Sequence, residues 1–446
     1  MFSRSVVHRV MVIVAALVLI GGIVLSRGAA TEGDELGTLA FGLTLVLGAA
    51  LAGGHLAARV GQPAVMGELI AGILLGNLPG LERLQFIGAD PYLDILARIG
   101  MLLLLFEVGV DLSVRDLVAV GRSSLLVALL GTVSSLAAGT AASVWLMRDA
   151  SFGSQVFVGA AITATSVGIT ARVLRDMSAS RSQEARIILG AAVIDDVLAL
   201  VVLGVIVAWV TPGPGGPSAP AASIAALIMK TFGFLVIAIV LGTMLTPAWF
   251  RQAARLRTEG ALLGSGLCFC FLLCWAATAL GLSAIVGAFA AGLVLEDAHS
   301  ALFVERGERP LVELLQPMTS FLVPIFFVLV GFRVNVASLT MPAVLALPLA
   351  LTVAAVVAKL SCALGVLHRG ANRLTVAVGM MPRGEVALVF AALGSTVTAG
   401  HAPILNEYGY TAIVTVVIVT TLLTPPALKW SLRARAHAGG VTTPAA

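Results

Sequence analysis

Two adjacent aspartates, Asp195 and Asp196, lie in the middle of an apolar segment that runs from Leu189 to Leu203. A charged side chain at the centre of a membrane helix costs about 2.5 to 3.5 kcal/mol on insertion scales, so a pair of acids there indicates a function that needs them. Neighbouring residues of an α-helix point about 100° apart. One aspartate can therefore face a water-filled cavity as an ion ligand, while the other faces a partner inside the protein.

Three further charged residues lie in apolar segments, namely Lys359, Arg383 and Glu385. A buried lysine beside a carboxylate can hold an ion pair in one state and release its proton in another. Carboxylates that bind either a proton or a hard monovalent cation exchange the two directly, because each ligand expels the other. A structural ion pair explains Arg383 with Glu385 equally well. It explains two side-by-side acids poorly, and these acids indicate a cation and proton site.

The composition indicates that these charged residues lie in a membrane protein. Hydrophobic residues make up 59% of the 446 residues and charged residues only 11%. Such a chain is typical of a polytopic helical membrane protein, and no stretch is left for a soluble catalytic domain. We therefore predict an all-α polytopic membrane protein with about 13 to 14 transmembrane helices, near residues 10–26, 37–58, 63–80, 92–110, 122–146, 155–175, 184–210, 223–249, 258–280, 283–296, 310–332, 341–367, 372–398 and 408–430.

Basic residues gather in alternate loops when the N-terminus is placed in the cytoplasm. The positive-inside rule then places the C-terminus in the cytoplasm as well, and we expect a multi-pass protein of a bacterial plasma membrane. The first segment has two interpretations. Arg4, His8 and Arg9 precede an apolar run that fits a retained span, but the run followed by Ser26 to Ala30 also fits a cleaved signal sequence.

An internal repeat relates the two halves of the chain. Gly61 to Leu75 aligns with Gly281 to Leu295, with three glycines and two alanines preserved at a constant offset. The same offset places the aspartate-pair segment over the last span. Six spans in each half are separated by one span near 223–249. Equivalent spans are therefore seven spans apart, and because this number is odd the second copy has the inverted orientation in the membrane. Inverted repeats are the architecture of alternating-access transporters, whose substrate lies at the repeat interface.

Each copy contains a polar interruption at the equivalent position. Thr163 to Gly168 interrupts an apolar span of the first copy, and Pro382 to Glu385 interrupts one of the second. A pair of ordinary kinks closed by packing is the alternative, and it is less favoured because the two breaks occupy equivalent repeat positions. Freed carbonyls and half-helix ends can coordinate a cation, so we predict paired interrupted helices beside the acids.

Together these motifs resemble the monovalent cation:proton antiporter-2 family, close to its NapA-type sodium/proton antiporters, over about residues 37–430. The resemblance rests on Gly61 to Gly72, Thr163 to Thr170, Ile194 to Val197, Pro324 to Val328, Lys359 and Pro382 to Glu385. It implies an NhaA-like fold of two inverted six-helix repeats with crossing interrupted helices.

The resemblance also implies roles for single residues. Asp196 would be the principal cation and proton carboxylate, and Asp195 would pair with Lys359. Thr163 and Ser166 in the first break would cross Arg383 and Glu385 in the second. The expected Na⁺ ligands are Asp196, Asp195 and Thr163.

A homodimer with an outer scaffold and a moving core is a further implication. The expected parts are an N-terminal segment at 1–36, scaffold helices at 37–121 and 258–340, core transport helices at 122–210 and 341–430, a loop and linker helix at 211–257, and a cytoplasmic tail at 431–446.

We therefore expect a secondary active transporter, not an enzyme, that exchanges a monovalent cation, Na⁺ first, for protons in an electrogenic cycle that serves pH homeostasis. Its partners are the transported ions and the lipid bilayer, with no cofactor and no nucleic acid, since the basic residues form no cluster. A K⁺/H⁺ antiporter of the same family is the alternative. A cation channel would need a continuous pore, and an intramembrane aspartyl protease would need acids from two different helices.

Overall fold

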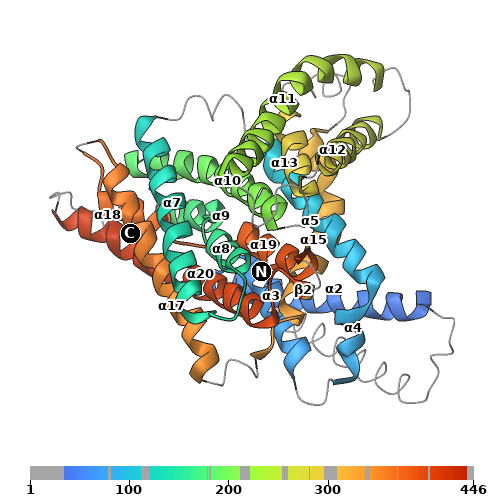
Figure 1. Ribbon diagram of the computed structural model, residues 1–446, viewed down its shortest axis with the longest axis horizontal. Helices are drawn as coiled ribbons and strands as arrows, with labels where there is room; N and C mark the ends of the chain where they lie inside the picture. The colour runs from blue at the N-terminus through green and yellow to red at the C-terminus, as the bar shows by residue number, and fades with distance from the viewer. Residues whose placement is uncertain are drawn as a thin grey trace. The chain divides into compact units, whose positions relative to one another are not determined.

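Helices account for almost all of the described chain in the computed structural model (Figure 1). The structure describes residues 35–78, 82–111, 121–177, 179, 182–210, 221–253, 260–280, 282–295, 309–336, 342–368, 370–399 and 402–438. The predicted span near 10–26 lies outside these residues. Each of the other predicted spans contains helix among its described residues, so the prediction of an all-α fold is confirmed.

Eight helices in the described chain are long and apolar enough to cross a membrane. Four shorter apolar helices accompany them. Thr398–Ala399 (β1) and Ala402–Pro403 (β2) pair as two antiparallel strands. The inverted relation of the two halves remains a prediction.

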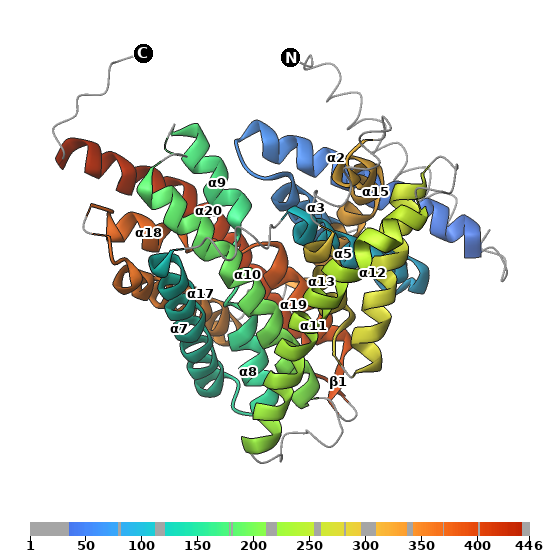
Figure 2. The ribbon, with the colours of Figure 1, turned by 90° about the horizontal axis from the view of Figure 1, so that it is seen from above.

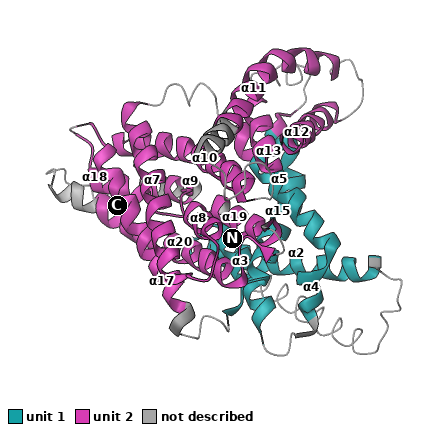
Figure 3. Cartoon of the chain, viewed as in Figure 1, with its two compact units in different colours: residues 1–105, 312–339 teal, residues 106–311, 340–446 magenta. Residues whose placement is uncertain are grey.

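The chain divides into two compact units, coloured separately in Figure 3. Unit 1 comprises residues 1–105 and 312–339. Its elements are α2 (Glu35–Arg59), α3 (Ala64–Asn77), η1 (Glu82–Gln85), α4 (Phe86–Ala89), the first part of α5 (Pro91–Asp111) and most of α15 (Leu311–Phe332). Glycines allow close helix packing in this unit, because a side chain at Gly67 would collide with the backbone at Gly53 of α2.

Unit 2 comprises residues 106–311 and 340–446 and contains every residue of the predicted cation and proton site. Its elements are α7 (Arg122–Leu146), α8 (Phe152–Ala161), α9 (Val167–Asp176), α10 (Gln183–Val210), α11 (Ala221–Ala253), α12 (Ala261–Ala279), α13 (Ala284–Val294), α17 (Pro342–Leu360), η3 (Ser361–Gly365), α18 (Arg373–Gly379), α19 (Glu385–Thr396) and α20 (Glu407–Ala438). Within it, α7 packs against α8, α10 and α17 (Figure 2). The predicted scaffold and core boundaries remain predictions, since compactness does not report which helices move.

Both predicted interruptions are present in unit 2. The span predicted at 155–175 is divided into α8 and α9 by residues 162–166, and the span predicted at 372–398 is divided into α18 and α19 by residues 380–384. Pro382 lacks the N–H that would continue a helix, and Gly384, with φ −146° and ψ −140°, is the non-helical N-cap of α19. The local sequence therefore accounts for the second break.

Candidate cation and proton site

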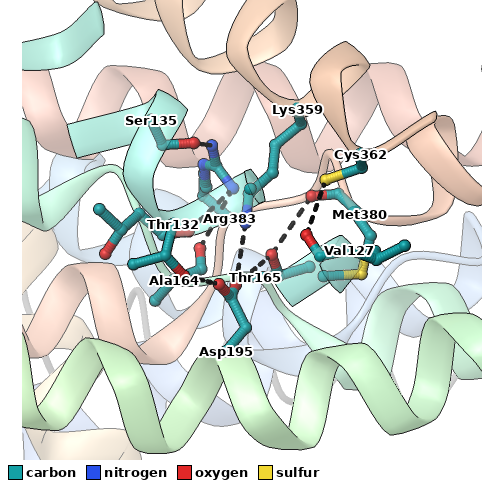
Figure 4. Close-up of polar contacts among 12 residues, drawn as sticks. Val127, Thr132, Ser135, Ala164, Thr165, Asp195, Lys359, Cys362, Met380 and Arg383 are labelled. Atoms are coloured by element: carbon teal, nitrogen blue, oxygen red, sulfur yellow. Dashed lines mark hydrogen bonds and ion pairs between the residues drawn. The ribbon is translucent and has the colours of Figure 1, made fainter. Parts of the chain in front are cut away.

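Asp195 is held by three donors from three other elements (Figure 4). Thr132 Oγ1 of α7 donates to Oδ1 over 2.6 Å, and Thr165 Oγ1 of the first break donates to Oδ2 over 2.6 Å. Lys359 Nζ of α17 lies 2.9 Å from the same Oδ2. These charge-assisted bonds fix the orientation of the carboxylate at the centre of α10.

The Lys359–Asp195 ion pair is fully buried, with 0% of either side chain exposed. Removing one partner of such a pair typically costs about 3 to 5 kcal/mol, because an uncompensated charge is left behind. Gly131 of α7 provides the space for the ammonium, since a Cβ there would lie 3.0 Å from Lys359 Nζ and 2.9 Å from Cys362 Sγ. The pairing is the one that the resemblance implies.

Asp196 follows directly on α10 and is also buried, with 6% of the residue exposed against 0% for Asp195. The turn of about 100° between neighbouring helical residues directs the two carboxylates to different sides of the helix. Asp195 therefore forms the ion pair, while the Asp196 side chain points in a different direction from the same level of α10.

The two breaks contact each other beside this pair. Ser166 N–H donates to Pro382 O over 2.8 Å, and Thr165 Oγ1 lies 3.3 Å from Met380 O. A Cβ on Gly384 would lie 2.6 Å from the Cβ and Oγ of Ser166. The interrupted segments therefore meet at backbone distance, and glycine at 384 is required by that approach.

Arg383 lies where the two breaks contact each other, and its guanidinium is fully buried. Its Nη1 donates to Thr163 O at 3.3 Å and Ala164 O at 3.4 Å, and its Nη2 donates to Ser135 Oγ at 3.2 Å and Ala355 O at 3.3 Å. A cation here offsets the negative end of the helix dipole at the C-terminus of α8. The backbone of the same residue is held by the hydroxyls of Thr420 and Thr421 on α20.

The threonine of the first break that contacts an aspartate of the pair is Thr165 and not Thr163, which the sequence analysis named. The Thr163 hydroxyl donates to Ala160 O over 2.7 Å, and Thr165, two residues later in the same break, reaches Asp195. The sequence did not predict Thr132, because it is one of seven serines and threonines on α7 and nothing in the sequence distinguishes it from the others. Glu385 begins α19, but its side chain lies outside the described residues, so its predicted pairing with Arg383 remains a prediction.

A family model described as "Sodium/hydrogen exchanger, transmembrane" matches residues 42–434. The "High-affinity Na(+)/H(+) antiporter NhaS3" of Synechocystis is 32% identical over 424 residues, covering 87% of this chain and 88% of that protein. The "Na(+)/H(+)-K(+) antiporter GerN" of Bacillus cereus is 33% identical, covering 89% of this chain and 96% of that protein.

A solved structure has the same fold. The sodium proton antiporter MjNhaP1 from Methanocaldococcus jannaschii matches with a TM-score of 0.67 at 17% identity, covering 90% of this chain and 99% of that one. The family match spans most of the sequence, and it includes both breaks and the aspartate helix. The chain therefore belongs to the transmembrane sodium/hydrogen exchanger family.

Proposed function

We propose that this protein exchanges Na⁺ for protons across a membrane by alternating access. The observation that carries the proposal is the buried Lys359–Asp195 pair, placed next to Asp196 where two interrupted helices meet. The names of three similar proteins agree with it, since they describe sodium/proton antiporters.

Asp196 is the carboxylate that binds either the cation or a proton. Its protonation removes the negative charge that holds the cation, and cation binding expels the proton. Hydroxyl and carbonyl oxygens of the first break, including those of Thr163 and Ser166, are hard ligands suited to complete a Na⁺ site.

Asp195 and Lys359 supply a second proton. When Asp195 leaves its ion pair to help coordinate the cation, the lysine loses the charge that stabilises its ammonium and releases a proton. One cation is then exchanged for two protons, and the cycle moves net charge. The protein acts in this scheme without a cofactor.

The arrangement suits exchange better than either rival activity. The acids of an aspartyl protease must flank a peptide bond together, whereas both oxygens of Asp195 are already occupied by Thr132, Thr165 and Lys359. A channel needs an open pore lined by oxygens or charges. At this site the described residues instead form a buried cluster.

The larger organisation follows the same proposal. The core helices around α10 carry the site across the membrane relative to a scaffold, in a homodimer of the plasma membrane with a cytoplasmic C-terminus. Alternating access by movement of one bundle against another is the general behaviour of inverted-repeat transporters.

Reconstitution in sealed vesicles tests the function. With a pH-sensitive dye in the lumen, we expect an outward or inward Na⁺ gradient to move protons in the opposite direction, with a weaker response to K⁺. Proton-tight vesicles without protein are the control. Because GerN is named for both Na⁺ and K⁺, a response to K⁺ equal to that for Na⁺ would favour the K⁺/H⁺ alternative. No cation-dependent pH change from correctly inserted protein contradicts the proposal.

The contact between the two breaks yields a second expected result. Gly384→Ala forces a Cβ to within 2.6 Å of Ser166, and over-packing of this kind costs about 1 to 3 kcal/mol. We expect the strain to fall on the conformation in which the two breaks meet and exchange to decrease about tenfold, since 1.4 kcal/mol between two conformations is a factor of about ten. Gly264→Ala on α12 is the matched control, because a Cβ there meets no atom within 4 Å in the described chain. Equal rates in both variants would show that the close approach is not needed for transport.

A further inference from the structure

The Thr132 hydroxyl has an unusual hydrogen-bond partner for a buried threonine in a helix. Buried threonines in helices commonly donate to the carbonyl four residues earlier, as Thr246 does to Gly242 O over 2.5 Å and Thr424 does to Thr420 O over 2.7 Å. The Thr132 hydroxyl instead crosses from α7 to α10 and donates to Asp195 Oδ1. Its residue is only 5% exposed, so the bond is shielded from water.

The two oxygens of Asp195 are held by different groups. Within the described part of the chain, Lys359 and Thr165 share Oδ2, whereas the bond to Oδ1 comes from Thr132. Thr165 belongs to a break and also contacts the second break through Met380 O. Thr132 lies on an uninterrupted helix of 25 residues. Of the two hydroxyl donors, Thr132 is therefore the one that lies on a continuous helix.

The neighbouring residue brings α7 close to the other partner of the pair. A Cβ at Gly131 would lie 3.0 Å from Lys359 Nζ. Gly131 therefore lies beside one member of the ion pair, and the next residue, Thr132, donates to the other. We infer that Thr132 is a positioning residue for exchange, which holds the Asp195 carboxylate in the orientation that pairs with Lys359. This inference rests on the proposed function.

The hydroxyl should influence the affinity of the site for the cation. A carboxylate that a donor already holds in place loses less freedom when it coordinates a cation, and such preorganisation strengthens binding. The ionisable groups around Asp195 are Lys359 on α17, Arg383 in the second break, Cys362 on η3 and Asp196 on α10 itself. Substitution at Thr132 leaves all of them in place.

Thr132→Val replaces the hydroxyl with a methyl group of nearly the same size. We expect this variant to keep exchange but to raise the apparent KM for Na⁺ about three- to tenfold, because the carboxylate is no longer held in place before the cation binds. The kcat should change little. Thr132→Ser keeps the donor and should restore the wild-type KM, while Thr132→Cys, a weaker donor, should fall between them.

Thr246→Val is the matched control, since it removes an equally buried hydroxyl that bonds only within α11. A wild-type KM for Na⁺ in Thr132→Val, or the same rise in Thr132→Ser, would overturn the inference. If the valine variant does not assemble, the order of the KM values of the serine and cysteine variants decides instead, and equal values count against it. Wild-type protein without any exchange would refute the proposed function, which is a different outcome from an unchanged KM.

Discussion

Asp196→Asn is expected to reduce cation-dependent proton movement to the level of vesicles without protein. An amide has nearly the shape of the carboxylate, so the fold and the neighbouring Lys359–Asp195 pair should persist. The amide cannot titrate and carries no negative charge for the cation, and both properties are required of the exchanging group. The effect should be the same at every pH, because no titratable group remains at this position.

The control for this substitution is Asp149→Asn. Asp149 is exposed in the turn after α7, and the change removes the same charge far from the site. It should exchange at the wild-type rate. Protein content and thermal melting in detergent establish that both variants are folded. Exchange by Asp196→Asn at a near-normal rate would exclude Asp196 as the carrier and leave Asp195 as the candidate.

The sequence predicted the helices of this fold closely. The span predicted at 122–146 coincides with α7, and the span predicted at 184–210 matches α10 to within one residue at its start. Long apolar runs are reliable because a membrane helix must satisfy all its own backbone groups. Both breaks were also predictable, since proline, glycine and clustered hydroxyls occur at equivalent positions of a repeat.

Contacts between segments far apart in the chain could not be predicted from the sequence. Thr132 and Asp195 are separated by 63 residues, and no periodicity links a threonine of one helix to an acid of another. The predicted span at 341–367 is likewise not one regular helix, because α17 gives way to the 3₁₀ helix η3 directly after Leu360. Ser134 Oγ of α7 donates to Ala358 O over 2.9 Å and lies 2.9 Å from Ser361 Oγ at this point. Local sequence does not encode such tertiary contacts.

This change of helix type lies next to Lys359, whose substitution should alter the voltage dependence of exchange. Lys359→Gln removes the group that we propose releases the second proton, while the amide can still donate one hydrogen bond to Asp195. The two threonine donors also remain to support that carboxylate. We therefore expect residual exchange in which one cation is exchanged for one proton and no net charge moves.

With the proposed exchange of one cation for two protons, the wild-type protein should respond to membrane potential at about 2.3 kcal/mol per charge per 100 mV. Imposing a diffusion potential of about 100 mV on vesicles should accelerate or oppose wild-type exchange according to its sign and leave Lys359→Gln almost unaffected. Lys359→Arg keeps the ion pair but is effectively always protonated, so it should also block the second release.

Lys230→Gln is the matched control, since Lys230 is exposed on α11, and it should retain the wild-type response to potential. Two results would remove Lys359 from the proton pathway. The first is wild-type exchange that ignores the imposed potential, and the second is a Lys359→Gln variant that follows the potential as the wild type does. In either case the buried pair with Asp195 would be a structural contact between α10 and α17, and Asp196 alone would carry the exchanged proton.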